Sequence, residues 1–264
     1  MQVFGIDLST WQKNYPYAKA TQDGVKFAII RAGFWTTTDN QFETHYKNAK
    51  KQGWGVGAYW YSYATTVAEA QMEAKAFLKV IKGKQFEYPL YIDIEDKTLS
   101  SLSKTQLDNN IKAFGKIIED AGYYFGVYTS SSWYSSKMNG KTLNKKYDWW
   151  VAQWSTAKPT GITYGMWQFG GSTNYIRGNK VAGVVTDQNY AYYDYPSIMK
   201  EKGLNGYAKE QPVIKTPEPV IEKPEPVITE PDPVIEKPVE QEAIKEDGLI
   251  MALIKAIIHL IFKK

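Results

Sequence analysis

The amino-acid sequence predicts an α/β fold, an irregular (β/α) barrel with eight strands and reduced helices, over residues 1–207. Apolar strand-like runs alternate with helical segments at intervals of roughly 25–35 residues in the first half, which is typical of parallel βα units. Eight such runs fall within about 195 residues, close to the lower size limit of a (β/α) barrel. A Pro-rich linker over 208–247 and a short C-terminal helix over 248–264 are expected to follow.

Short apolar runs predict the strands, and apolar residues at helical spacing predict the helices. Ser103 and Gln106 have the spacing of a capping box, which begins the clearest helix. Helices are expected at residues 40–52, 66–81 and 103–121, with a short helix or loop at 131–138 and a helical turn at 196–202. Strands are expected at residues 3–9, 27–33, 55–63, 90–95, 124–129, 148–154, 165–169 and 184–190.

Two acids, Asp93 and Glu95, end the buried strand expected at 90–95. Side chains alternate along a strand, so these two carboxyl groups should point to the same face. Repulsion between neighbouring carboxylates raises the pKa of one of them, as a general acid at neutral pH requires. The alternative is a strand end that meets a polar loop, with Glu95 in a structural salt bridge.

Asp7 and Asp187 also lie at or near the ends of expected strands. Function in βα barrels resides at the carboxyl ends of the strands, so the four acids are expected to reach one rim. Glycoside hydrolysis needs a proton donor and negative charge near the forming oxocarbenium ion. Glu95, the longer side chain, is the expected donor, and the Asp93 anion would hold its proton. Asp7 and Asp187 would orient substrate or water, although each could also be a structural aspartate.

Composition excludes several other chemistries. The chain has no Cys, which rules out disulfides, thiolate metal sites and a Cys nucleophile, and its two His argue against a His-rich metal site or a Ser-His-Asp triad. The acidic rim could bind Mg²⁺ or Ca²⁺, but no loop has the ligand spacing, so neither metal nor cofactor is expected. The 15% aromatic content suits either a carbohydrate-binding surface or a Tyr-rich core.

Charge is distributed unevenly along the chain. Residues 1–210 carry +7, which favours an anionic partner such as a cell wall, while the absence of Lys/Arg runs and RNA-binding motifs argues against nucleic acid. Residues 211–247 carry −6 and include three heptads that begin at Pro217, Pro224 and Pro231, which predict an extended acidic spacer.

The tail over 249–262 is almost wholly apolar and ends in Lys263 and Lys264. Fourteen residues make a helix of about 21 Å, which is shorter than the hydrocarbon core of a bilayer. We therefore expect a helix at a membrane surface, with self-association as the second alternative and a spanning helix as the third. Residues 1–5 show no secretory signal, so we expect synthesis in a host cytoplasm and action on the wall after release.

Three motifs resemble those of glycoside hydrolase family 25, the Chalaropsis-type lysozymes common as phage endolysins and bacterial autolysins. They are Gly-Ile-Asp-Leu-Ser-Thr-Trp-Gln at 5–12, Tyr-Ile-Asp-Ile-Glu at 91–95 and Thr-Asp-Gln-Asn-Tyr at 186–190, within a resemblance that covers about 1–200 in order. The resemblance implies an irregular barrel without a metal. It also implies cleavage of the β-1,4 bond between N-acetylmuramic acid and N-acetylglucosamine in peptidoglycan. By motif match, Glu95 is the catalytic acid, Asp93 its partner, and Asp7 and Asp187 the supporting acids.

Six further residues occupy motif positions near the expected rim, where they would contact sugars or, alternatively, pack in the core. They are Trp11, Tyr61, Tyr63, Tyr128, Trp154 and Gln168. The second chemical step stays open between inversion, a carboxylate nucleophile and attack by the substrate's own acetamido group, which we favour. One alternative function is an inactive barrel that binds wall glycan. The other is a chitinase-like hydrolase, because Asp93-x-Glu95 also resembles the end of the chitinase motif.

Overall fold

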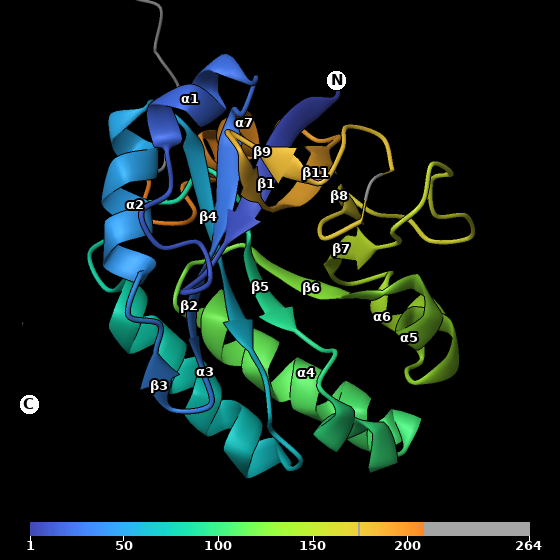
Figure 1. Cartoon of the computed structure of the whole chain (residues 1–264). Coiled ribbons are helices and arrows are strands. Elements are labelled where there is room, and N and C mark those ends of the chain that lie inside the picture. Colours follow the sequence, from blue (N-terminus) through green and yellow to red (C-terminus); the bar gives the residue numbers. More distant parts are fainter. Residues whose placement is uncertain (174, 209–264) are drawn as a thin grey trace, which may run out of the picture. The chain divides into compact units, whose positions relative to one another are not determined.

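The computed structural model describes residues 1–173 and 175–208 (Figure 1). The expected linker, from its second residue onward, and the expected C-terminal helix lie outside the described residues. Eight strands form the barrel: β1 (Val3–Leu8), β2 (Phe27–Phe34), β4 (Gly55–Tyr61), β5 (Leu90–Asp93), β6 (Phe125–Ser130), β7 (Asp148–Ala152), β8 (Met166–Gly170) and β11 (Asp187–Ala191). Their order is β1-β11-β8-β7-β6-β5-β4-β2, and pairing of β2 with β1 closes the circle. The predicted eight-stranded irregular α/β barrel is thereby confirmed.

Helices cover the outside of this barrel, and the longest ones follow its early strands (Figure 1). The expected long helices are α2 (Phe42–Lys51), α3 (Val67–Ile81) and α4 (Lys104–Asp120). Capping boxes begin α3, through Thr66 and Glu69, and α4, through Ser103 and Gln106. The remaining helices are α1 (Tyr17–Gln22), α5 (Ser131–Ser136), α6 (Gly140–Leu143), α7 (Tyr195–Lys202) and the 3₁₀ helix η1 (Lys97–Ser101).

The last barrel strand differs from the expectation. Instead of one strand over 184–190, β10 (Val184–Val185) forms a two-residue hairpin with β9 (Lys180–Val181), and β11 begins afterwards. Strand β11 runs antiparallel to both of its neighbours, β1 and β8, whereas the other neighbouring barrel strands are parallel. Asp187 is therefore the first residue of its strand, whereas the expected strand had begun three residues earlier. Because β11 is reversed, its start lies at the same rim as the carboxyl ends of the parallel strands.

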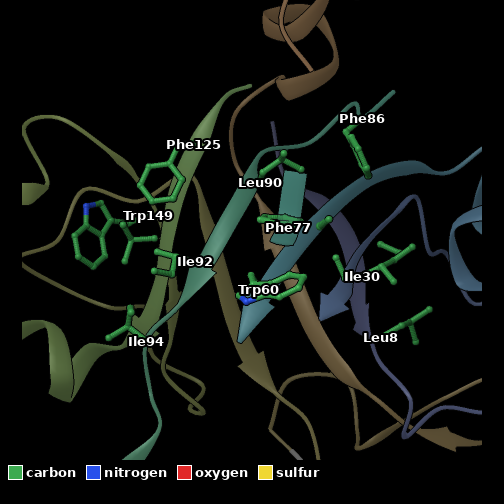
Figure 2. Close-up of a cluster of buried hydrophobic side chains, with 14 of the residues drawn as sticks. Leu8, Ile30, Trp60, Phe77, Phe86, Leu90, Ile92, Ile94, Phe125 and Trp149 are labelled. Carbon is green, nitrogen blue, oxygen red and sulfur yellow. The ribbon is translucent and has the colours of Figure 1, made fainter. Parts of the chain in front are cut away.

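Alternation along the strands divides the core into two layers. Residues that face outward pack against the helices, as Trp60 does against Phe77 of α3 (Figure 2). Residues that face inward form a second cluster, dominated by aromatic side chains. Glycines make room for these rings, because a Cβ at Gly5 or Gly126 would clash with the ring of Phe27 or Tyr91. The barrel interior is therefore a packed core without room for a ligand between its strands.

The amino end of the barrel, opposite this rim, is closed by α7 and the turn after it. Tyr195 of α7 packs into the interior cluster and donates a hydrogen bond to Asp148. Asn205 is fully buried, donates from Nδ2 to the Tyr88 carbonyl over 2.8 Å, and accepts from the Tyr124 amide over 2.7 Å. The end of the described chain is thus fastened to this amino end.

Candidate active site

Four carboxyl groups meet at one rim of the barrel. Asp7 lies near the carboxyl end of β1, and its register partner on β11 is Asp187. Asp93 is the last residue of β5, and Glu95 follows two residues later. Burial is the largest cause that raises the pKa of both Asp93 and Asp187, and the charges of Glu95 and Asp7 raise both further. The four predicted acids therefore form one electrostatic cluster.

Asp7 is buried and held by two amide side chains. Gln168 Nε2 and Asn189 Nδ2 both donate to its Oδ2, over 3.0 and 2.9 Å. Burial raises the pKa of Asp7 to about 6, and these two hydrogen bonds oppose the rise because they favour the charged form. Trp150 Nε1 donates to Asn189 Oδ1 over 2.8 Å, which fixes the amide with its donor toward Asp7.

Asn189 and Trp150 were not among the expected site residues. The sequence carried a signal for Asn189, because it lies two residues after Asp187 and therefore on the same face of its strand. Trp150 faces the barrel interior and is almost fully buried, which made it indistinguishable in sequence from an ordinary core residue.

Glu95 is the exposed member of the cluster. The surrounding protein still raises its pKa by removing water, the charges of Asp7 and Asp96 add to the rise, and a hydrogen bond from Tyr128 opposes it. The Tyr128 hydroxyl lies 3.3 Å from Glu95 Oε2 and 3.0 Å from Gln168 Oε1, so its single proton serves one of the two at a time. Glu95 is thus both accessible to a ligand and biased toward its protonated form.

Asp93 is more deeply buried, with 3% of its surface exposed. Its Oδ1 accepts no hydrogen bond from any described residue. Burial raises the pKa of Asp93 well above its ordinary value, with the charge of Glu95 as the second cause, while Arg31 opposes the rise. Burial thus disfavours the charged form of Asp93. The expectation of an Asp93 anion that holds the proton of Glu95 stays a prediction.

Asp187 is half-buried beside Gly171 and Trp154. Burial raises the pKa of Asp187 to about 8, and the charges of Asp7 and Glu95 contribute. A Cβ at position 171 would clash with Asp187 Oδ1 and would lie 2.8 Å from Trp154 Cζ2. Gly171 therefore allows the acid and the indole to approach each other closely.

Aromatic side chains flank the acids, with different degrees of exposure. The half-buried rings of Tyr61 and Tyr63 have centroids 5.2 Å apart, and the Tyr61 hydroxyl donates to Asp96 over 3.0 Å. Trp154 is half-buried, and the ring of Trp11 projects with 80% of the residue exposed. All four offer surface that a sugar ring could contact.

Two of the expected sugar contacts are instead buried beneath the acids. Tyr128 is 6% and Gln168 is 3% exposed. Gln168 Oε1 accepts from both Tyr128 and Trp154, each over 3.0 Å, while its amide nitrogen holds Asp7. Their evident role is to position carboxyl groups, and direct contact with a sugar stays a prediction.

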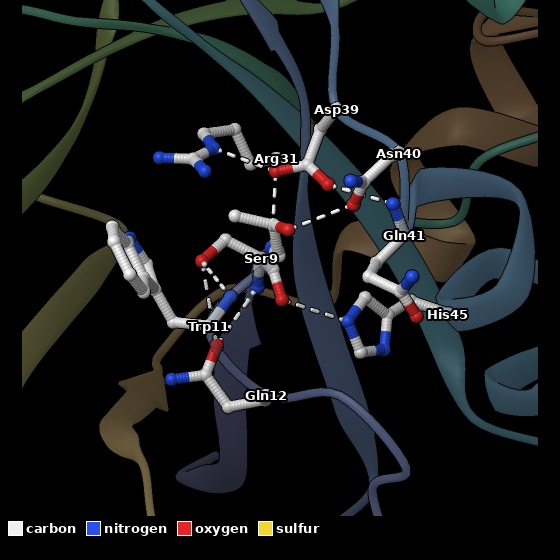
Figure 3. A network of polar contacts seen from close by, with 9 residues as sticks. Ser9, Trp11, Gln12, Arg31, Asp39, Asn40, Gln41 and His45 are labelled. Carbon is white, nitrogen blue, oxygen red and sulfur yellow. Dashed lines mark hydrogen bonds and ion pairs between the residues drawn. The ribbon is translucent and has the colours of Figure 1, made fainter.

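A second polar network holds the turn that follows β1 (Figure 3). Asp39 accepts from Arg31 Nε over 2.8 Å and from the Thr10 amide over 3.0 Å, both at Oδ2. His45 Nε2 lies 2.9 Å from the Ser9 carbonyl oxygen, so a neutral His45 donates there. These contacts fix the backbone that leads into Trp11. Neither Arg31 nor Asp39 was expected at the site.

Across residues 1–173 and 175–208, no helix is long and apolar enough to cross a bilayer. Over the same described residues, no group of three or more His, Cys, Asp and Glu side chains is arranged to hold a metal ion.

Similarity to known proteins agrees with this fold and site. YegX of Escherichia coli strain K12, an uncharacterised protein, is 27% identical over 63% of this chain and 62% of its own length. The N,O-diacetylmuramidase of Arthroderma benhamiae is 29% identical over 67% of this chain and 83% of its own length. The solved catalytic domain of endolysin ply40, from bacteriophage P40 of Listeria monocytogenes, is 25% identical with a TM-score of 0.60, covering 77% of this chain and 98% of that domain.

The chain spans about 62% of the length of the YegX proteins that it matches. The sequence profile of the Glycosyl hydrolases family 25 matches residues 6–178, which include Asp7, Asp93 and Glu95. This range covers more than half of the 264 residues and contains six of the eight barrel strands in full and the end of β1. The chain therefore belongs to glycosyl hydrolases family 25.

Proposed function

We propose that this protein is an N-acetylmuramidase, a lysozyme that hydrolyses the β-1,4 bond between N-acetylmuramic acid and N-acetylglucosamine in peptidoglycan. The observation that carries the proposal is the pairing of an exposed acid with a raised pKa, Glu95, and a buried acid, Asp93, within a four-acid rim. Membership of family 25 and likeness to a diacetylmuramidase support it.

Glu95 donates its proton to the glycosidic oxygen, and the bond to the anomeric carbon breaks. Asp93 acts on the other side of that carbon. Its unpartnered Oδ1 accepts a hydrogen bond from the N–H of the substrate's acetamido group, whose carbonyl oxygen attacks the anomeric carbon. Glu95, now ionised, then takes a proton from the water that opens the cyclic intermediate. We favour this acetamido route because Asp93 is buried and no described residue donates a hydrogen bond to its Oδ1.

Substrate binding favours a charged Asp93 beside a protonated Glu95. In the ligand-free protein, burial raises the pKa of Asp93 well above its ordinary value, and its Oδ1 has no hydrogen-bond donor among the described residues. A hydrogen bond from the acetamido N–H favours the charged form of Asp93. A sugar with an acetamido group therefore helps to keep the proton on Glu95, where the leaving oxygen needs it.

Digestion of purified peptidoglycan, with mass spectrometry of the new reducing ends, tests the proposal. We expect muramic acid at the new reducing end, and loss of product with Glu95→Gln but not with Glu201→Gln, a surface substitution on α7. N-acetylglucosamine at the new reducing end would indicate the chitinase-like alternative. Binding to the wall without any product would indicate an inactive glycan-binding barrel.

The biological role that we propose is lysis of a bacterial host by a phage or prophage endolysin. Similarity to the endolysin ply40 and to the CTP1L endolysin supports this role. The protein would be made in the host cytoplasm and reach the wall after release, with residues 249–262 attaching it to a membrane surface or joining copies of the chain. Liposome co-sedimentation and solution mass, compared between the full chain and a 1–210 truncation, test the two tail alternatives. Membrane attachment predicts that the full chain binds liposomes and that the truncation does not. Self-association predicts that the full chain has the solution mass of several copies and that the truncation has the mass of one.

A further inference from the structure

Arg31 is a cation placed at the acidic rim by the register of β2. Phe27 and Ile29 face the barrel interior, so alternation directs Arg31 to the same side, opposite Tyr59 of β4. Its charge lowers the pKa of the neighbouring Asp93 against the larger effect of burial, which places the guanidinium within electrostatic reach of the catalytic pair. A positive charge here lies where an anionic group of a bound ligand would otherwise meet only carboxylates.

Among the described residues, hydrogen bonding engages only the Nε edge of this guanidinium. Arg31 Nε donates to Asp39 Oδ2 over 2.8 Å, and the Asp39 side chain is fully buried. Asp39 Oδ1 accepts from the Gln41 amide over 2.8 Å, so the anchor is itself rigid. The ring of Phe34 lies against the guanidinium, with its centroid 5.4 Å from Cζ. In Figure 3 the two terminal nitrogens of Arg31 extend away from Asp39.

Those terminal nitrogens find no hydrogen-bond partner among the described residues, although only 13% of the side chain is exposed. A guanidinium edge with two parallel N–H donors matches a carboxylate, which can accept both bonds. Had the site required only positive charge near Asp93, a lysine would have served as well. The fixed, unused fork indicates a planar anionic ligand.

We propose, on the basis of the muramidase function above, that Arg31 binds a carboxylate of the wall glycan and so selects muramic acid strands over neutral chitin-like strands. Muramic acid differs from N-acetylglucosamine by a 3-O-lactyl group, which ends in a carboxylate when no peptide is attached. In peptide-bearing strands the same recognition would use a carboxylate of the stem peptide.

The test is a cycle of two enzymes and two substrates. Peptide-free glycan strands are prepared with their lactyl carboxylates free or amidated, and kcat/KM is measured for the wild type and for Arg31→Gln. Amidation should lower kcat/KM of the wild type roughly ten- to hundredfold, the range of a hydrogen bond to a charged group. Arg31→Gln should already be lowered on free strands and should not respond to amidation. Arg31→Lys should recover only part of the activity, because it keeps the charge without the fork.

The chain offers a matched control in its other arginine, Arg177, which donates to the Asp23 carbonyl and covers the Phe4 ring. Arg177→Gln should respond to amidation as the wild type does. The same four measurements on peptide-bearing strands, with peptide carboxyl groups free or amidated, identify the source. An Arg31-dependent response in either pair of strands supports carboxylate recognition and tells which carboxylate is bound.

An equal response to amidation in the wild type and in Arg31→Gln, on both kinds of strand, would overturn the inference. So would an Arg31→Gln enzyme that is slowed equally on all strands with a displaced pH profile, because Arg31 would then act only through Asp93. Should the wild type cleave no strand, the muramidase proposal fails by itself. Calorimetric binding of free and amidated strands to the same variants then decides the role of Arg31.

Discussion

Replacing Asp187 by Asn should make the folded protein more stable at alkaline pH while it weakens activity. The pKa of Asp187 is raised to about 8 by burial and by the charges of Asp7 and Glu95, against an ordinary value of 3.8. Between these values the folded state binds more protons than the unfolded state, so this group lowers the free energy of unfolding as pH rises. Its full destabilising effect is present above pH 8 and is absent below about pH 4.

The magnitude follows from the shift. A displacement of about four units at 1.36 kcal/mol per unit sets an upper limit of about 6 kcal/mol for a group that titrates alone. Asp187 shares its interactions with Asp7 and Glu95 and is only half-buried, so Asn should restore roughly 1–3 kcal/mol at pH 8.5. At pH 4 the gain should fall to about 0.5 kcal/mol or less, because the carboxyl group is then neutral in the folded state and only about half ionised in the unfolded state.

Urea unfolding of the wild type and of Asp187→Asn at pH 4, 6 and 8.5 measures this dependence. Asp120→Asn is the matched control, because Asp120 is exposed and pairs only with Lys116 one helical turn away. That substitution should change the free energy of unfolding by less than about 0.5 kcal/mol at any of the three pH values. A stability difference for Asp187→Asn that stays constant from pH 4 to 8.5 would refute the reasoning.

Three further substitutions test how the acids are held. Gln168→Glu removes a hydrogen-bond donor to Asp7 and adds a like charge beside it. The acid limb of the pH profile of kcat should therefore move to higher pH, and kcat should fall roughly tenfold. The control Gln153→Glu lies outside this network and should leave the pH profile in place. Gly171→Ala should lower kcat severalfold with a near-normal melting temperature, because the new methyl displaces the Asp187 carboxyl group; an unchanged kcat would mean that its position is unimportant. Glu73, whose pKa burial raises to about 7, accepts hydrogen bonds from the Ser62 hydroxyl and the Tyr63 amide and so places the Tyr63 ring. Glu73→Gln should therefore raise KM more than it lowers kcat. Equal changes in KM and kcat would contradict this role.

Much of the fold could be predicted because its signals are local. The capping boxes and apolar periodicity fixed α3 and α4 to within one or two residues, and apolar runs located all eight barrel strands. The direction of β11 could not be predicted, because the direction in which a strand pairs depends on partners that are distant in the sequence. The apolar pattern of β11 is the same whether it runs parallel or antiparallel to its neighbours. Short elements such as α6 and the β9–β10 hairpin were not predicted, because a run of two to four residues is too short to show a periodicity.

The acids of the candidate site could be predicted from the sequence, but the hydrogen-bond network of Asn189 and Trp150 that holds Asp7 could not. Asp93 and Glu95 stand in one motif, and their charges identify them. Asn189 donates a hydrogen bond to Asp7, 182 positions away in the chain, and Trp150 donates to Asn189, 39 positions away. No local sequence pattern records either relation. Burial is also the largest cause that raises the pKa of both acids, and sequence alone could not show that Asp93 is covered while Glu95 is exposed.

The reversed direction of β11 has a consequence for how this catalytic unit can be joined to others. A parallel eighth strand would have delivered the chain to the rim of acids, where whatever came next would begin beside the substrate. Strand β11 instead starts at that rim and carries the chain to the opposite end, where α7 and Asn205 fasten it. The described chain therefore ends at the face of the barrel opposite the rim of acids. Sequences of different length and character can be exchanged there without rebuilding the machinery that cuts the glycan.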